Sequence, residues 1–412
     1  MSSQHACERC GESFSQKAHL TSHMKRKNPC KKDSALSLEK IQELIEKQHP
    51  NPQDSLLYAW SKSMLTSCDV VKPPLKWVGG KTQILDELMK KIPRKIKNYY
   101  EPFLGGGSVL LAILSHQKAN NMTIEGKICA SDVNENVIAL YKNIQSNLPA
   151  LLEQLTTIFQ VFEKCPSASD SDSVNRKPIS NAEALSSKES YYYWIRNCFN
   201  KISDKEHLTP AASAMLLFLN KTCFRGVYRE GPHGFNVPYG HYKNPGIYDE
   251  SHLRQVSELI KDVEFHNIPF TQALLHSETG DFVYLDPPYA PSEKNSFVSY
   301  NASGFKEKDH KDLFKLCHHL RTNSIRFLLS NSDVDMVTKE FPEADYETHV
   351  LSCKRSINSK DPSQRANEVL IRPLLGEFPL LPPLPLPLPL PLPLQKEKEK
   401  EKEDKEALSL GR

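Results

Sequence analysis

The sequence predicts an α/β fold, an open sheet with helices, preceded by a small unit rich in cysteine and histidine. From residue 72 onward, short apolar strand-like segments alternate with segments of helical periodicity, which is typical of an open α/β sheet. The first 32 residues contain the one tight cysteine pair of the chain. The 412 residues, 39% hydrophobic and 25% charged, suffice for two or three globular modules.

The elements of the sheet can be assigned to residue ranges. Strands are expected at 99–103, 127–131, 281–285, 325–330 and 368–372, and helices at 82–91, 108–114 and 134–144. Between about 150 and 275 the strand signal fades, and helical segments such as YYYWIRNCFNKI and PAASAMLLFLN are interrupted by the polar SASDSDSVNRKPIS. We therefore expect one domain over 73–376, with an inserted, mainly helical lobe at about 150–275.

The flanking segments differ in composition from this domain. Residues 33–72 are polar with one helix-like stretch, SLEKIQELIEKQ, and are interpreted as a linker. Residues 377–412 consist of a Pro-Leu run followed by a Lys-Glu run, and we expect both to be disordered. The Pro-Leu run could bind an aromatic groove on a protein partner, although a stiff spacer is the simpler interpretation.

Composition also bounds the environment of the protein. No run of 18 apolar residues occurs, which argues against a membrane span, and the start MSSQHACERC has no apolar signal region. We therefore expect that the chain is not exported, and ten irregularly spaced cysteines in such a chain argue against a disulfide framework. We therefore expect a reducing intracellular compartment, cytoplasm or nucleus. A net charge of +3 is too small by itself to identify a polyanionic partner.

The amino-terminal unit, residues 5–32, has the spacing of a zinc finger. The predicted ligands are Cys7, Cys10, His23 and Cys30. Two thiolates, an imidazole and a third thiolate form a Cys-Cys-His-Cys set that suits structural zinc, with Phe14 and Leu20 at the positions of the small core. His19 is a weaker rival ligand, and chance spacing is the alternative. A single finger could hold DNA, RNA or a protein, but it reads only about three base pairs.

A glycine-rich turn points to a nucleoside cofactor. In YYEPFLGGGSVLLAIL an expected strand runs into Gly105-Gly106-Gly107 and then into a helix, and the next strand ends in Asp132. Glycines permit close approach of a ligand, and an acid at the second strand end can bind a ribose diol. The absence of a P-loop lysine counts against ATP. A helix-packing turn and a surface acid are the alternative interpretation.

Two further stretches extend this site. Upstream, Trp77 and Lys81 in LKWVGGK are interpreted as closing over the cofactor, with a core tryptophan and a helix-start charge as the alternatives. Downstream, the expected strand FVYL ends in Asp286-Pro287-Pro288-Tyr289. A carboxylate and an adjacent carbonyl on a rigid turn can accept both hydrogens of an exocyclic amino group, while Tyr289 stacks on the base. A base reaches such a pocket only after leaving the duplex.

Seven ordered motifs, LKWVGGK, EPFLGGGS, SDVNEN, NKTCFRGVYR, GFNVPYG, LDPPYAP and RSIN, resemble the Dam-type DNA N6-adenine methyltransferases over roughly residues 73–375. The resemblance implies a Rossmann-like sheet and S-adenosylmethionine as cofactor. It implies cofactor binding by Trp77, Lys81, Phe103, Gly105, Asp132 and Asp286, and a catalytic group of Asp286, Pro287 and Tyr289.

The same resemblance implies double-stranded DNA as substrate, bound by a monomer. NKTCFRGVYREGPHGFNVPYG corresponds to a DNA-reading hairpin, in which Arg229 falls where an arginine reads the guanine of GATC. Arg225 departs from the asparagine often found at its position, which leaves the target open. The expected DNA-binding residues are Lys76, Arg225, Arg229, Asn236, Tyr300, Arg355 and Asn358.

Two other functions stay open at this point. A zinc-finger DNA-binding protein could keep the fold as a scaffold, although no catalytic position is lost. The same amino-transfer chemistry could act on cytosine N4 or on RNA. Carbon-5 methylation is disfavoured, because no Pro-Cys turn stands at a strand end. The finger and the tail are additions to the usual bacterial enzyme, and a finger that ends in Lys-x-Pro-Cys resembles those of large DNA viruses of eukaryotes, which suggests a viral or eukaryote-associated source. The sequence leaves restriction, protection and replication marking as alternative roles.

Overall fold

A computed structural model describes residues 68–167, 174–243, 245–246, 248–291, 304–354 and 365–375, together with residues 5–6, 13–14 and 21. The chain divides into two compact units, residues 1–69 and 70–412. In the first, β1 (His5–Ala6) pairs antiparallel with β2 (Ser13–Phe14). The four predicted zinc ligands, most of the predicted linker and the predicted tail lie outside the described residues.

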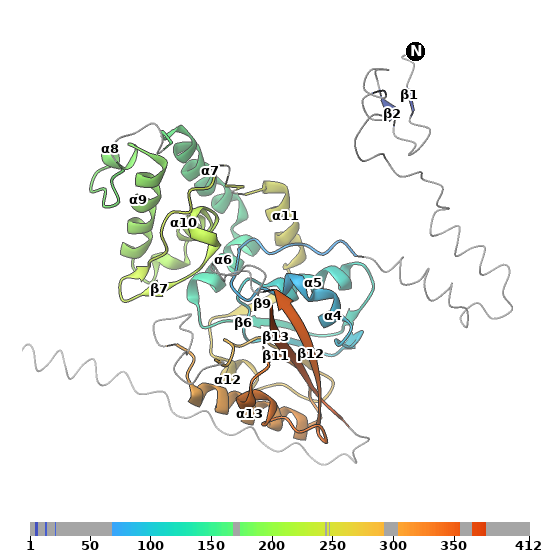
Figure 1. Cartoon of the computed structure of the whole chain (residues 1–412). Coiled ribbons are helices and arrows are strands. Elements are labelled where there is room, and N and C mark those ends of the chain that lie inside the picture. Colours follow the sequence, from blue (N-terminus) through green and yellow to red (C-terminus); the bar gives the residue numbers. More distant parts are fainter. Residues whose placement is uncertain are drawn as a thin grey trace, which may run out of the picture. The chain divides into compact units, whose positions relative to one another are not determined.

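The second unit is organised around a seven-stranded sheet with the order β12-β13-β11-β10-β4-β6-β9 (Figure 1). The strands are β4 (Tyr99–Glu101), β6 (Ile128–Ser131), β9 (Val263–His266), β10 (Phe282–Leu285), β11 (Arg326–Ser332), β12 (Tyr346–Lys354) and β13 (Arg365–Pro373). The pairs from β11 through β10, β4 and β6 to β9 are parallel, whereas β13 runs antiparallel to both β11 and β12. The predicted α/β fold is therefore confirmed, and the structure shows that its central sheet is mixed and mostly parallel.

Two strands of the seven-stranded sheet were not predicted. β9 lies inside the range 150–275 predicted for the lobe, yet it forms one edge of the central sheet. Its four residues alternate between buried and exposed, a pattern too short to stand out in the sequence. The other is β12, which is held at the opposite edge by β13. Both are edge strands, which mix polar with apolar residues because one long side faces no neighbouring strand.

The two faces of the sheet bury different cores because side chains alternate along a strand. In β10, Phe282 and Tyr284 belong to one cluster, and Val283 and Leu285 to the other. The first cluster includes residues of α4 (Leu85–Met89), α5 (Ser108–Lys118), α6 (Glu135–Ser146) and α11 (Glu250–Leu259). The second includes residues of α12 (Phe270–Ala273), α13 (Glu307–Thr322) and α14 (Asp335–Thr338). Figure 1 shows α5 and α13 on opposite sides of the sheet.

A helical lobe is continuous with the first core. It comprises α7 (Leu148–Lys164), α8 (Asn181–Ala184), α9 (Lys188–Lys201) and α10 (Pro210–Thr222), followed by the hairpin of β7 (Glu230–Gly231) and β8 (Gly234–Phe235). Aromatic side chains hold it together: Phe218 of α10 lies 5.2 Å from Phe162 and 5.9 Å from Tyr191, measured between ring centroids. In the described part of the chain, no helix combines the length and apolar character needed to cross a membrane.

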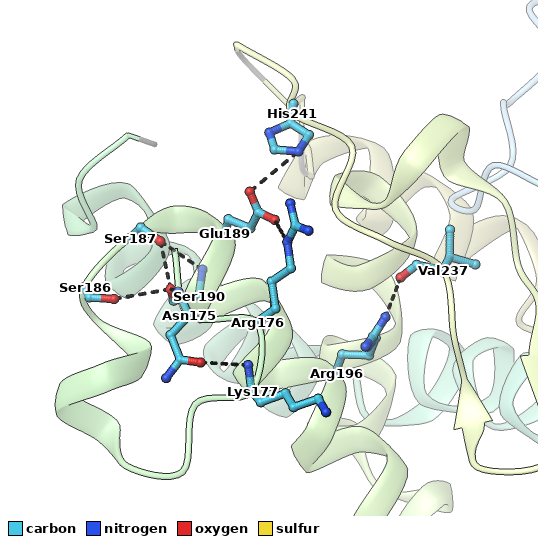
Figure 2. A network of polar contacts seen from close by, with 10 residues as sticks. All are labelled: Asn175, Arg176, Lys177, Ser186, Ser187, Glu189, Ser190, Arg196, Val237 and His241. Atoms are coloured by element: carbon cyan, nitrogen blue, oxygen red, sulfur yellow. Dashed lines mark hydrogen bonds and ion pairs between the residues drawn. The ribbon is translucent and has the colours of Figure 1, made fainter. Parts of the chain in front are cut away.

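A polar network fastens the outer surface of this lobe (Figure 2). Glu189 of α9 is buried, with 3% of its side chain exposed, and it accepts a 2.7 Å hydrogen bond from Arg176 Nε. His241 Nε2 lies 3.6 Å from the same carboxylate. Arg196 donates to the carbonyl of Val237 at 3.0 Å. These contacts tie the segment before α8 and the chain after the hairpin to the face of α9.

Candidate active site at the carboxyl edge of the sheet

A cleft of about 1200 Å³ opens at the carboxyl ends of β4, β6 and β10. Parallel strands end at one edge of a sheet, so the residues that follow them are brought together even though they are distant in sequence. Of the predicted site residues, Lys76, Trp77, Lys81, Phe103, Gly105, Asp132, Arg225, Asp286, Pro287 and Tyr289 all line this cleft.

An ion pair lies at the centre of the cleft. Lys81 Nζ is 2.7 Å from Asp286 Oδ2, and the two side chains are only 3% and 20% exposed. The same ammonium group donates to the carbonyl of Gly79 at 2.5 Å and lies 4.9 Å from the centroid of the Tyr289 ring. The pKa of Asp286 is raised to about 6, mainly by burial. The positive charge of Lys81 lowers this pKa, and the negative charge of Glu368 raises it.

Hydrogen bonds from β11 fix the turn that carries Asp286. The amide of Ala290 donates to Asn331 Oδ1 at 2.9 Å, and Ser332 Oγ donates to the carbonyl of Ala290 at 2.5 Å. The sequence predicted a rigid turn from its two prolines alone. The neighbouring strand adds a second restraint, so both ends of the Asp-Pro-Pro-Tyr segment are held by the sheet.

Two of the acids that line the cleft and were not predicted, Glu101 and Glu368, accept hydrogen bonds from tyrosine hydroxyls. Glu101, the last residue of β4, is 2% exposed and accepts a 2.6 Å hydrogen bond from Tyr99 Oη. Burial raises the pKa of Glu101 to about 8. Glu368 of β13 accepts a 2.9 Å hydrogen bond from Tyr289 Oη. Glu101 was not predicted because the strand was expected to continue to residue 103, whereas β4 ends at Glu101 and so places this acid at the edge of the sheet. Glu368 reaches the edge only because β13 is antiparallel.

The glycine-rich turn is shaped by packing as well as by any ligand. Gly105 has a φ of +47°, and a Cβ on it would lie 2.7 Å from the indole nitrogen of Trp77. The indole of Trp77 in turn stacks on Tyr228, with 5.1 Å between ring centroids. The glycines therefore make room for Trp77, and this tryptophan joins the turn to the lobe as well as lining the cleft.

The hydrogen-bond acceptor and the walls at this end of the cleft fit a nucleoside. Asp132 accepts hydrogen bonds from the amides of Gly105 and Asn134, each at 2.8 Å, which fix its carboxylate at the cleft wall. A carboxylate has about four acceptor sites, so this one can also accept a hydrogen bond from a hydroxyl donor. Phe103 stacks on Phe270, with 5.3 Å between their ring centroids. Both rings line the cleft, where they supply a flat apolar wall for a base.

The predicted DNA-reading segment forms a hairpin. Arg229 donates from Nε to Asn236 Oδ1 at 2.7 Å, and the amide of Asn236 donates to the carbonyl of Arg229 at 3.1 Å. These two side chains are exposed and lie outside the residues that line the cleft. Arg225 lines the cleft and has a left-handed backbone, with a φ of +58°. The predicted contacts Tyr300, Arg355 and Asn358 fall outside the described residues.

Another group of ligand-type residues lies away from the predicted site. Cys129, Glu264 and His266, on β6 and β9, place one ligand atom each within 4.8 Å of one another. Glu264 is already paired with Lys127 at 3.2 Å. None of these residues lines the cleft or belongs to the predicted zinc finger.

Comparison with known proteins gives a consistent assignment. Residues 77–357 match the family of D12 class N6 adenine-specific DNA methyltransferases. The type II methyltransferase M.MjaIII of Methanocaldococcus jannaschii is 36% identical over 299 residues, which cover 70% of this chain and 94% of the relative. The retron Ec67 DNA adenine methylase of Escherichia coli is 28% identical over 298 residues, covering 72% of this chain and 89% of the relative. The chain belongs to the D12 class N6 adenine-specific DNA methyltransferase family.

Proposed function

We propose that this protein transfers a methyl group from S-adenosylmethionine to N6 of an adenine flipped out of double-stranded DNA. The observation that carries the proposal is the meeting of Asp286 with Trp77, Lys81 and Asp132 in one cleft at the carboxyl edge of the sheet. The cofactor, when bound, supplies an electrophilic methyl group on a sulfonium. Its ribose hydroxyls suit Asp132, and its base suits the aromatic wall of Phe103.

The residues of the Asp-Pro-Pro-Tyr turn would act on the amine. Asp286 and the carbonyl of Pro287 accept its two hydrogens and direct its lone pair toward the methyl group, while Tyr289 stacks on the base. As the new N–C bond forms, the bond between the methyl group and the sulfonium breaks with its electron pair going to sulfur, and the amine is left with one proton too many. Asp286 is the nearest base in the turn to take it, because a carboxylate with a pKa of about 6 is ionised at neutral pH.

Lys81 would keep the Asp286 carboxylate ionised. An isolated anion in a mostly buried site would take up a proton, and the ammonium group at 2.7 Å opposes that. The lysine also fills the space beside the Tyr289 ring, 4.9 Å from its centroid. It therefore orients both members of the proposed base pocket before any DNA arrives.

GATC is the target that the hairpin favours. Arg229 can bind guanine through O6 and N7, which is worth about 1–3 kcal/mol of discrimination per base. Its contact with Asn236 holds the guanidinium in place at the hairpin. Lys76, Arg225 and Asn236 are proposed as further DNA contacts from the described part of the chain, with Tyr300, Arg355 and Asn358 as contacts from the rest.

The other segments would assist this activity. The methyltransferase domain would span residues 73–376, with the lobe at about 150–275 contributing β9 to the sheet. Cys7, Cys10, His23 and Cys30 would hold one structural zinc ion, and a finger stabilised in this way could help the monomer to hold DNA. The Pro-Leu segment would serve as a spacer or a partner site.

One experiment tests target and chemistry together. DNA from cells that express the protein is digested with one enzyme that cuts only methylated GATC and with another that cuts only unmethylated GATC. We expect protection from the second enzyme, and mass spectrometry of the nucleosides should identify N6-methyladenine. N4-methylcytosine would support the alternative chemistry, and DNA binding without any methylated base would support the scaffold alternative. Asp286→Ala should abolish methylation while DNA binding persists.

A further inference from the structure

The antiparallel strand β13 places an acid at the same edge of the sheet where the parallel strands have their carboxyl ends. Because β13 runs antiparallel to β11, its first residues lie where β11 finishes, and Glu368 pairs in register with Ser332. Glu368 lines the same cleft as Asp286 and Tyr289. No lysine or arginine forms an ion pair with it in the part of the chain that the structure describes. The Glu368 carboxylate accepts a hydrogen bond from the Tyr289 hydroxyl.

The Tyr289 ring is therefore restrained from two directions. Its hydroxyl donates to Glu368 Oε2 at 2.9 Å, which fixes the far end of the ring. Lys81 Nζ lies 4.9 Å from its centroid and restrains its position. Lys81 is itself held by Asp286 at 2.7 Å. A chain of contacts thus runs from Glu368 through Tyr289 and Lys81 to Asp286, linking β13 to the turn after β10.

We propose that Glu368 is a positioning residue for methyl transfer: it locks the Tyr289 ring as a stacking platform for the target base. This inference rests on the proposed function, since the platform matters only if a base enters the cleft. A tyrosine held at one end only can pivot about its Cβ, and the stacked base would follow it. Displacing a reacting group by about 1 Å can cost roughly 100-fold in rate.

The hydrogen bond predicts a specific pattern of rates. Tyr289→Phe and Glu368→Ala each remove the same contact, so each should lower the single-turnover rate of methyl transfer by roughly 10- to 100-fold. The double variant should be no slower than the slower single variant, because the second change removes nothing that remains. Glu368→Gln keeps an acceptor oxygen and should restore most of the rate. Affinity for S-adenosylmethionine, measured by calorimetry, should stay within about twofold in all four variants.

The charge of Glu368 gives a second readout that a packing role would not move. Lys81 and Glu368 act on the pKa of Asp286, and the charge of Asp286 in turn raises the pKa of its neighbours Glu101, Tyr284 and Tyr289. Among them, Glu368 raises the pKa of Asp286. Glu368→Gln removes that charge and keeps the acceptor, so the acid limb of the rate profile should move to lower pH. Asp335→Asn, an exposed carboxylate of α14 outside the cleft, is the matched control and should leave both readouts unchanged.

Each outcome bears on the proposal. Additive losses in Tyr289→Phe and Glu368→Ala, or a fully active Glu368→Ala, would overturn it. Parallel loss of cofactor affinity and of melting temperature in both Glu368 variants would indicate a structural role and would equally overturn it. A wild-type protein that methylates no DNA would contradict the proposed function instead, so the two failures are distinguishable.

Discussion

The cleft and the hairpin of this protein hold their polar groups in different ways. In the cleft, Lys81 is 3% exposed and already paired with Asp286, on a turn fixed by β11. In the hairpin, Arg229 and Asn236 are exposed and bind mainly each other. Reacting groups must be oriented before the substrate binds, whereas reading groups must be able to exchange an internal contact for a base.

The two regions also differ in the free energy that is lost when one of their polar contacts is removed. Contacts in the cleft are shielded from water, so losing one partner leaves a charge that water cannot fully compensate. Contacts in the hairpin are exposed and weak, so their loss changes the choice of DNA far more than the stability of the fold. The predictions below test this contrast, beginning with the largest expected effect.

Removing the cation of the cleft should have the largest effect. In Lys81→Met, Asp286 loses its partner, and burial should raise its pKa further, so that less carboxylate is available at neutral pH. We expect the single-turnover rate of methyl transfer to fall by roughly 100-fold or more. Lys90→Met removes an exposed lysine paired with Glu87 and should have no such effect. Equal rates of methyl transfer in Lys81→Met and Lys90→Met would contradict the expectation that buried contacts of the cleft matter more than exposed ones.

The buried acid Glu101 should make stability depend on pH. Its pKa of about 8 in the folded state lies above the ordinary value, so the folded protein binds a proton that the unfolded chain releases. Stability should therefore fall as pH rises from about 4.5 to about 8. Glu101→Gln should be more stable than the wild type at pH 8.5, by on the order of a few kcal/mol, with the difference vanishing near pH 4.5. Thermal unfolding at both pH values checks this.

Changing the reading residue should alter selection among sequences. Arg229→Ala should reduce the preference for GATC over a duplex altered at the guanine by about 1–3 kcal/mol, seen in the ratio of kcat/KM values. The melting temperature should stay close to the wild type, because Arg229 is exposed and its contact with Asn236 is the main one lost. Arg254→Ala, another exposed arginine, serves as the control. A large loss of stability in Arg229→Ala would show that the hairpin contacts stabilise the fold as the buried contacts of the cleft do.

The rate should follow the ionisation of Asp286. With a pKa of about 6, its carboxylate form predominates above that pH and disappears below it. We expect the single-turnover rate to be level above about pH 7 and to fall about fivefold between pH 6 and pH 5. DNA binding measured over the same range shows whether the hairpin follows the same titration. A rate that is flat down to pH 5 would exclude Asp286 as the titrating group.

The smallest effect concerns the strained residue between the two regions. Arg225 has a φ of +58°, a conformation that asparagine adopts more readily than arginine. Arg225→Asn should raise the free energy of unfolding by up to about 1 kcal/mol. It should also weaken DNA binding in a salt-dependent way, since one cation is lost. Calorimetry and a salt titration of binding measure the two effects, and a loss of stability would contradict the strain argument.

Much of the site could be predicted because its residues end strands. Asp132 and Asp286 each follow an apolar run, and a parallel sheet brings such ends to one edge. Glu101 gave no such signal, because the apolar Phe103 and Leu104 that follow it made the strand look longer than β4 is. The pairing of Lys81 with Asp286 could not be read in this way, because more than 200 residues separate them and only the folded cleft brings them to 2.7 Å.

By itself, the amino-acid sequence determined the alternation of strands and helices, the rigid Asp-Pro-Pro-Tyr turn and the glycines that bend the chain after β4. Local geometry decides these features, because side-chain periodicity, fixed proline φ and glycine freedom act over a few residues. Only the tertiary structure decided that β13 runs backward, that Glu368 meets Tyr289 and that Trp77 fills the glycine bend. Those contacts join distant segments, and the packing of the whole sheet determines which segments meet.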